Sequence, residues 1–314
     1  PPGAPPSTAP RPSGPWCWPV DEWAAALAAW PALSGVSPRP VPGYPDVADL
    51  GAAGLLKRCR QAEALERELA ALGDLAALGL PVASPRRTAQ GAPWVQRPEG
   101  RYVWLPRLPG VHLTDLLDRP DHARLTGAAI ARVHRAYARL PERPIYRRAR
   151  MADDLAGRDL PRMARAGCAA AWAPRLTALT ARLEAMETLP RQWVHGDMHA
   201  ENLLFDRGAL SGLLDCDKTQ HNLRLYDVAY FARCLLMHGW GGPQLLRRWR
   251  AAVGSLAEGY GLPPAERAGL GAAVMAVECS LIAYFIQIDH GDYLRGSLEL
   301  FALMNDANLM DTVL

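Results

Sequence analysis

Lysine is nearly missing from this 314-residue sequence, where Lys57 and Lys218 are the two exceptions in a basic set of 35 that is otherwise arginine. The formal net charge is only +3, and no stretch gathers the basic residues into a stripe. No nucleic-acid partner is therefore expected, because such proteins concentrate Lys and Arg on one face. Because nearly every basic residue here is arginine, the two lysine positions are candidates for a specific role.

Paired cysteines are missing as well. The six cysteines are scattered, with no CxxC pair. The pattern favours small buried thiols in a reducing compartment over disulfides. We therefore expect a cytoplasmic protein.

Long apolar runs are rare. The one candidate for a membrane span, residues 270–288, has Glu278 at its centre and neither basic flanks nor an aromatic belt, so it predicts a buried helix and no membrane partner. The start of the chain, PPGAPPSTAPRPSGP, lacks the basic and apolar parts of a secretory leader. Its composition predicts a disordered Pro-rich tail over residues 1–18.

The rest of the sequence predicts two lobes in an α+β fold. Residues 19–108 contain short apolar segments between Gly and Pro, typical of hairpins in a small antiparallel sheet, and leucines at helical spacing over residues 61–78. A Pro-Gly break begins at Pro109, and residues 109–314 are mostly helical in pattern. One hairpin, within residues 202–217, interrupts these helices.

The segment WVHGDMHAENLLF, residues 193–205, carries the strongest chemical signal. Asp197 and Asn202 have the Asp-to-Asn spacing of a kinase catalytic loop, and Asp215 follows at the end of an apolar strand. Amide and carboxylate oxygens are ligands for Mg²⁺, so Asn202 and Asp215 are candidate metal ligands. Each residue alone is more typical of a turn or cap, but the set at fixed offsets favours phosphoryl transfer.

Together with GLLDCDK and LYDVAYFARCLL, the motif HGDMHAENLLF resembles the aminoglycoside phosphotransferase and choline kinase-like family of small-molecule kinases, relatives of the protein kinases. The resemblance implies a two-lobe protein-kinase-like fold, with a small N-terminal antiparallel-sheet lobe for nucleotide and a larger, mainly helical C-terminal lobe for catalysis and the acceptor. It implies Asp197 as catalytic base, Asn202 and Asp215 as metal ligands, Asp227 as a structural acid that steadies the loop, and His195 as a packing and hydrogen-bonding residue. ATP is the expected donor, and GTP stays open as an alternative.

The nucleotide lobe offers a second line of evidence. Lys57 lies in the strand-like GLLKRC just before the amphipathic helix, where a compact ammonium group suits nucleotide phosphates. The resemblance selects Glu68 as its partner over Glu63 and Glu66. No G-x-G-x-x-G motif is present, so Gly43 in VPGYPDVADLGAAG is the candidate phosphate-loop glycine.

The acceptor leaves few traces in the sequence. Glu278 lies where the family places acceptor contacts, but a salt bridge to one of the arginines is the structural alternative. Asp289, in IDHGDY, either lines the same cleft and attracts a cationic substrate or faces water.

The expected function is Mg²⁺-dependent transfer of the ATP γ-phosphoryl group to a hydroxyl of a small molecule. The acceptor is either an antibiotic such as an aminoglycoside, which would make antibiotic resistance the role, or an amino alcohol, amino acid or sugar of metabolism. A catalytically silent kinase-like module that binds nucleotide or a partner is the alternative from another class. The protein is expected to be a monomer or homodimer.

Overall fold

The computed structural model describes residues 20–239 and 244–311, which divide into two compact units. We name them the sheet unit and the helical unit. Among the described residues, the sheet unit contains residues 20–111 and 203–218, and the helical unit contains residues 112–202, 219–239 and 244–311. The predicted Pro-rich tail lies outside the described residues, and the predicted lobe ranges 19–108 and 109–314 stay predictions.

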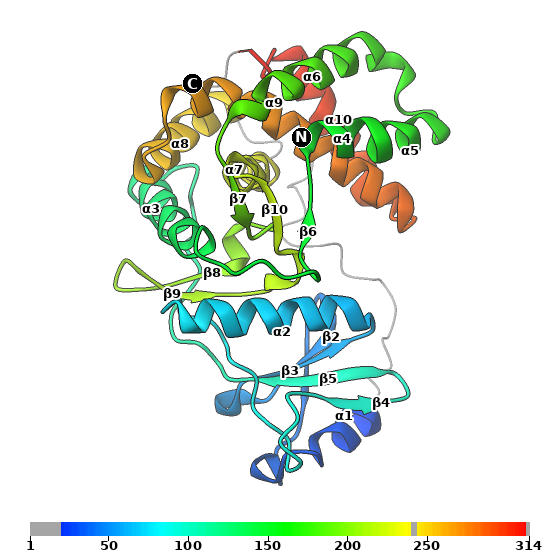
Figure 1. Ribbon diagram of the computed structural model, residues 1–314, viewed down its shortest axis with the longest axis vertical. Helices are drawn as coiled ribbons and strands as arrows, with labels where there is room; N and C mark the ends of the chain where they lie inside the picture. Colours follow the sequence, from blue (N-terminus) through cyan, green and yellow to red (C-terminus); the bar gives the residue numbers. More distant parts are fainter. Residues whose placement is uncertain (1–19, 240–243, 312–314) are drawn as a thin grey trace. The chain divides into compact units, whose positions relative to one another are not determined.

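A five-stranded sheet forms the centre of the sheet unit, in the order β1-β2-β3-β5-β4 (Figure 1). All neighbouring strands pair antiparallel, which confirms the predicted small antiparallel sheet. The strands are β1 (Arg39–Val41), β2 (Tyr44–Asp49), β3 (Leu55–Cys59), β4 (Val95–Arg97) and β5 (Gly100–Leu105).

Two helices lie on opposite sides of this sheet, α1 (Val20–Leu27) and α2 (Ala62–Ala77) (Figure 1). Trp23 of α1 is buried in one cluster with Leu56 of β3 and Tyr102 of β5. Because side chains alternate along a strand, Lys57 points to the other face, which α2 covers. The alternation of β3 thus brings an ammonium group to the predicted amphipathic helix.

The predicted hairpin of residues 202–217 is present as β8 (Leu203–Asp206) and β9 (Ala209–Leu213), which pair antiparallel. Arg207 and Gly208 form the turn, with φ of 48° and 77°. Two consecutive positive φ values are typical of the tight turn whose twist matches that of the two strands.

The helical unit contains most of the helices and a small three-stranded sheet of order β6-β10-β7. β10 (Gln220–Leu223) pairs parallel with β6 (Arg147–Arg148) and antiparallel with β7 (Arg191–Val194). The helices are α3 (Pro120–Tyr137), α4 (Met151–Asp154), α5 (Leu160–Arg165), α6 (Ala173–Ala185), α7 (Leu225–His238), α8 (Leu245–Tyr260), α9 (Pro264–Gln287) and α10 (Gly291–Asp306).

Helices α3 and α8 cross where both carry glycine. A Cβ atom added to Gly127 would lie 2.0 Å from the carbonyl oxygen of Leu256, and one added to Gly259 would lie 2.0 Å from that of Arg124. Real Cβ atoms do not approach a carbonyl so closely, so the two backbones can pack at this distance only because both side chains are absent. This crossing places the C-terminal end of α8 against α3.

Within the described residues, α9 is the one helix long and apolar enough to cross a membrane, and 72% of its most apolar window is buried inside the protein. Its buried positions run around the whole helix and include Glu278 and Cys279. A helix that is apolar on all sides and surrounded by protein is typical of a core helix. The predicted buried helix is therefore confirmed for residues 270–283, whereas Tyr284, Gln287 and Ile288 are exposed.

The five cysteines of the described residues form no disulfide. Burial is the largest cause that raises the pKa of Cys59 and of Cys234 to about 12, so neither thiol is a ready nucleophile. Cys216 and Cys279 are buried, as expected, whereas Cys59, Cys168 and Cys234 are partly exposed.

Candidate functional site

Lys57 of β3 is the centre of a charged cluster in the sheet unit. Its Nζ lies 3.0 Å from both carboxylate oxygens of Glu68 on α2 and 2.7 Å from Oδ1 of Asp215. Glu68 is the partner that was predicted over Glu63 and Glu66, which are both exposed on the same helix. One ammonium group thus lies between two carboxylates that are far apart in the sequence.

The charges of this cluster change one another's pKa. Burial by itself lowers the pKa of Lys57, but the carboxylates of Glu68 and Asp215 outweigh it and raise that pKa well above its ordinary range. Burial is also the largest cause that raises the pKa of Glu68, with Lys57 acting against it and Asp215 adding to it. Lys57 therefore stays a cation at neutral pH, as a phosphate-binding group requires.

Asp215 is held in an unusual backbone conformation, with φ of 54°. The left-handed region is tolerated by Asp better than by most residues, and such positions gather at functional sites. Its side chain is 44% exposed although Lys57 contacts it. The carboxylate is therefore both positioned by a salt bridge and accessible from solvent.

The predicted catalytic loop of the helical unit begins directly after β7. Asp227 of α7 is fully buried and accepts a hydrogen bond of 2.8 Å from the backbone N–H of His195 and one of 2.9 Å from that of Gly196. His195 is itself buried, and its Nδ1 lies 3.3 Å from the backbone N–H of Asp197. A single buried carboxylate thus fixes the backbone that leads into Asp197.

The buried Asp227 carboxylate and its hydrogen-bond partners form an anchor for the loop of Asp197. His134 of α3 belongs to this anchor and was not singled out from the sequence. Its Nε2 lies 2.9 Å from Oδ2 of Asp227, and its Nδ1 lies 2.7 Å from the hydroxyl of Tyr260 on α8. Burial by itself raises the pKa of Asp227, but the hydrogen bond and charge of His134, with the charge of His195 and the Gly196 N–H, bring it below its ordinary value. The one available signal was a histidine on the apolar face of the α3 pattern.

Asp197 lies half-buried among polar groups of the same unit. The side-chain Nδ2 of Asn202 donates a 2.8 Å hydrogen bond to the backbone carbonyl of Asp197, and His199 Nε2 lies 3.9 Å from Oδ1 of Asp197. The phenol of Tyr230 is partly buried. Its desolvation, followed by the Asp197 charge and hydrogen bond, raises the pKa of Tyr230. Tyr230 thus remains a neutral hydrogen-bonding neighbour of the carboxylate.

The chemistry of Asn202 and Asp215 fits Mg²⁺. Both hydrogen bonds of the Asn202 side chain use Nδ2, so its carbonyl oxygen can serve as a ligand for a cation. Asp215 has an accessible carboxylate, and amide and carboxylate oxygens are each ligand types that a hard cation such as Mg²⁺ takes. Asn202 belongs to the helical unit and Asp215 to the sheet unit.

The other predicted site residues are Gly43, which lies in a turn, Glu278, which is buried in the core, and Asp289, which is exposed. Gly43 lies in the exposed β1–β2 turn with φ of 85°, a conformation that glycine adopts readily. Glu278 is fully buried and makes two contacts with the guanidinium of Arg233, one of them 3.1 Å long. This salt bridge, the alternative left open by the sequence, accounts for the buried carboxylate without an acceptor. Asp289 is exposed at the end of α9.

The comparison with protein families shows to which family the chain belongs. A model of the phosphotransferase enzyme family, APH, matches residues 49–265, a range that includes Lys57, Asp197 and Asp227. The chain belongs to this family. A homoserine kinase of Pseudomonas aeruginosa is 36% identical over 157 residues, which are 48% of this chain and 47% of that protein. The chain thus spans about half the length of the curated relative it matches.

Solved structures agree with the family at the level of the fold. Aminoglycoside 2'-phosphotransferase-IIIa, in a GDP complex, has a TM-score of 0.67 at 13% identity and covers 92% of this chain and 99% of its own. A microcompartment-associated aminopropanol kinase has a TM-score of 0.66 at 18% identity, with 91% and 95% covered. A choline/ethanolamine kinase family protein from Mesorhizobium loti has a TM-score of 0.65 at 21% identity, with 93% and 94% covered. The predicted α+β, protein-kinase-like fold of this phosphotransferase family is confirmed.

Proposed function

We propose that this phosphotransferase moves the γ-phosphoryl group of ATP to a hydroxyl group of a small molecule, with Mg²⁺ as cofactor. The observation that carries the proposal is the loop of Asp197 and Asn202, whose backbone is held by the buried Asp227 carboxylate. Phosphoryl transfer depends mainly on positioning and charge, so a rigidly held carboxylate beside an amide ligand is the feature that this chemistry needs.

Each residue has a role in this proposal. Asp197 accepts the hydrogen bond of the acceptor hydroxyl and takes its proton as the oxygen attacks. Lys57, kept charged by Glu68 and Asp215, binds phosphate oxygens of the nucleotide. Asn202 and Asp215 would hold Mg²⁺, which supplies neutralisation of the phosphate charge when bound. GTP is retained as an alternative donor.

The acceptor class separates two roles within the same chemistry. An aminoglycoside or another antibiotic would make the enzyme a resistance factor, and an amino alcohol, amino acid or sugar would place it in metabolism. The homoserine kinase relative supports a hydroxy amino acid, although its match covers only half of each chain. The structural neighbours named for aminoglycosides and aminopropanol support the fold and leave this choice to experiment.

The test is ADP release from Mg-ATP with aminoglycosides, amino alcohols, sugars and hydroxy amino acids offered one at a time. The Asp197→Asn variant serves as the blank, and mass spectrometry of the acceptor identifies the phosphate ester. An acceptor that raises ADP and gains a phosphate only with the unmodified protein supports the proposal. Binding of Mg-ATP without transfer to any member of the panel would favour the catalytically silent module instead.

A further inference from the structure

Tyr260 is the last residue of α8, and its hydroxyl reaches the anchor of the loop that carries Asp197. The helix ends there because Gly261 takes the left-handed conformation, with φ of 73°, that ends many helices. The neighbouring Gly259 has no side chain, and a Cβ atom there would lie 2.0 Å from a backbone carbonyl oxygen of α3. The close crossing of the two helices brings the Tyr260 hydroxyl to 2.7 Å from Nδ1 of His134.

Both ring nitrogens of His134 therefore have a partner. Nε2 lies 2.9 Å from the carboxylate of Asp227, whose pKa is lowered, and an ionised carboxylate only accepts, so Nε2 must carry a proton. Nδ1 accepts the hydroxyl proton of Tyr260 when the imidazole is neutral and donates to the hydroxyl oxygen when the imidazole is charged. The hydroxyl thus satisfies Nδ1 in either state and keeps Nε2 directed at Asp227.

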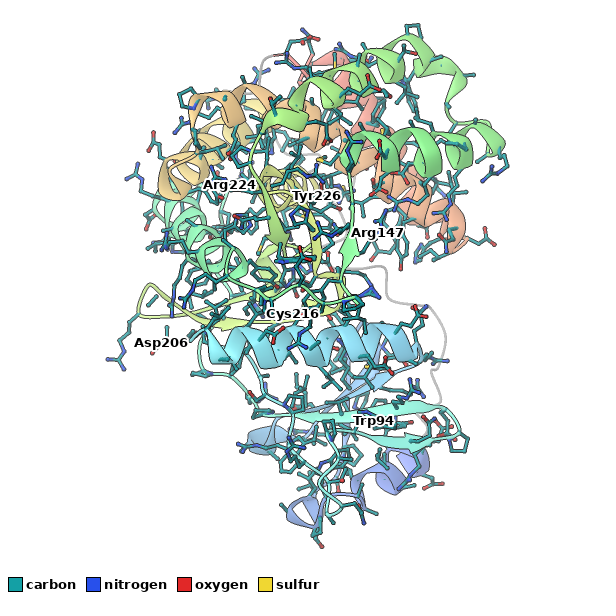
Figure 2. All side chains as sticks on the ribbon, viewed as in Figure 1. Trp94, Arg147, Asp206, Cys216, Arg224 and Tyr226 are labelled. Carbon is teal, nitrogen blue, oxygen red and sulfur yellow. The ribbon has the colours of Figure 1, made fainter. Side chains whose placement is uncertain are left out.

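The ring of Tyr260 is itself held in place. It meets the ring of His134 edge to face, with 5.4 Å between the centroids, and the guanidinium carbon of Arg224 lies 6.0 Å from its centroid. Arg224, labelled in Figure 2, directly precedes α7. It donates three hydrogen bonds of 2.6–3.2 Å to the buried carboxylate of Glu266 on α9. These contacts restrict the directions in which the Tyr260 hydroxyl can turn.

The hydroxyl of Tyr260 also keeps its proton. Burial is the largest cause that raises the pKa of Tyr260, with Arg224 acting against it and Glu266 and Asp227 adding to it. Without this hydroxyl, Nδ1 of the buried His134 ring would lack its partner, and an imidazole that turned to find another would take Nε2 away from Asp227. The hydroxyl is therefore the group that makes one ring orientation the favoured one.

Asp227 transmits this orientation to the loop, because it accepts hydrogen bonds from two backbone N–H groups there. Resting on the proposed function, we infer that Tyr260 is a positioning residue for phosphoryl transfer. Its hydroxyl orients His134, whose Nε2 orients the Asp227 carboxylate. That carboxylate fixes the loop of Asp197, so the end of α8 contributes to the rate of transfer through His134.

Amide hydrogen exchange by NMR, on the full chain without nucleotide or acceptor, tests the positioning. Tyr260→Phe removes the hydroxyl and keeps the ring. We expect the N–H groups of His195 and Gly196 to exchange about tenfold faster, while buried amides of α9 change by less than about twofold. Tyr284→Phe, which removes the hydroxyl of an exposed tyrosine, should change neither. Unchanged exchange at His195 and Gly196, or equal acceleration in α9, would overturn the inference.

The rate of transfer is the second readout, with the acceptor that the ADP assay identifies. Tyr260→Phe should lower kcat about tenfold and leave both KM values within about twofold, because the loop changes position and the substrates bind as before. In a His134→Gln background, where Nδ1 is gone, the same change should alter kcat by less than about twofold. An equal loss in both backgrounds, or a raised KM with unchanged kcat, contradicts a role through His134.

Failure of this inference and failure of the proposed function give different results. Hydrogen exchange requires no phosphoryl transfer. Faster exchange confined to the loop in Tyr260→Phe, in a protein for which no acceptor raises ADP, would overturn the kinase activity and keep the positioning of the loop. Transfer to an acceptor with loop amides that do not respond to Tyr260→Phe would keep the kinase activity and overturn the inference.

Discussion

Nε2 of His134 lies 2.9 Å from Oδ2 of Asp227, and both side chains are buried. The same carboxylate accepts hydrogen bonds from the backbone N–H groups of His195 and Gly196. Helices α3 and α7 therefore hold the loop that carries Asp197 before any substrate is bound. Positioning of this kind is what phosphoryl transfer asks of a protein, since little of its barrier is lowered by covalent chemistry.

Replacing Asp227 should lower the stability of the protein, because its carboxylate anchors the loop that carries Asp197. Asp227→Ala leaves two buried N–H groups and His134 without their acceptor, and we expect a loss of about 3–5 kcal/mol in the free energy of unfolding. Asp227→Asn keeps one acceptor oxygen and should cost less. Urea denaturation measures both, with exposed Asp292→Asn as the control that stays within about 0.5 kcal/mol.

The same anchor should give the protein a pH dependence. The pKa of Asp227 is lowered in the folded state, so its contribution is complete above the unfolded pKa of about 4 and is lost as the pH falls through the folded value. The stability difference between the unmodified protein and Asp227→Asn should therefore be constant from pH 7 down to about 5 and shrink below about 4. A difference that grew on acidification would contradict this assignment.

The pairing of Lys57 and Glu68 should matter for nucleotide binding. Glu68→Gln removes one of the two carboxylates that hold the ammonium group, and we expect the Kd for Mg-ATP to rise at least about tenfold, the size of one lost charged hydrogen bond. Glu66→Gln changes an exposed residue of the same helix and is the matched control. Equal Kd values for both variants would argue that Lys57 does not bind phosphate.

Glu278 is expected to affect stability and not the acceptor. Glu278→Gln leaves the guanidinium of Arg233 buried without its anion, which should cost about 3 kcal/mol or more of unfolding free energy. Asp289→Asn, an amide change at an exposed position that keeps the tolerance for positive φ, should cost less than about 0.5 kcal/mol. An unchanged denaturation midpoint with a raised acceptor KM for Glu278→Gln would return this residue to the substrate site.

The α3–α8 crossing offers a test of packing alone. Gly127→Ala places a methyl group 2.0 Å from a backbone carbonyl, so the helices must separate and the free energy of unfolding should fall by about 2 kcal/mol or more. Gly73→Ala on α2 meets no atom within 4 Å, and helix propensity should there raise stability by up to about 1 kcal/mol. Opposite signs for the two variants in thermal unfolding are the expected result.

The parts of the fold that the sequence predicted well are those with local signals. The five-stranded sheet, helix α2 and the β8–β9 hairpin each have periodicity or turn residues within the segment itself. The three-stranded sheet was missed, because β6 has only two residues and its register partners in β10 lie 73 residues later in the sequence. No local pattern records such a pairing.

The candidate site also contains residues with a local sequence signal and residues without one. Spacing selected Asp197, Asn202 and Asp215 as candidates, and their roles stay predictions. The contact between Lys57 and Glu68, chosen by resemblance, is present in the structure. His134 and the Arg233 partner of Glu278 were not singled out, because each meets its acid through helix packing and no sequence spacing links either residue to its acid. Buried ion pairs depend on tertiary contacts, so sequence gives the buried acid and leaves its partner open.

The central claim is that Asp197 is the catalytic base, and the single-turnover rate of Asp197→Asn tests it most directly. The experiment uses saturating Mg-ATP, the acceptor identified by the ADP panel, and a check that the variant binds both and unfolds at the same denaturant concentration. The account predicts a loss of at least ~10²-fold in the rate of transfer. A loss of less than tenfold in a folded, fully bound variant would contradict it.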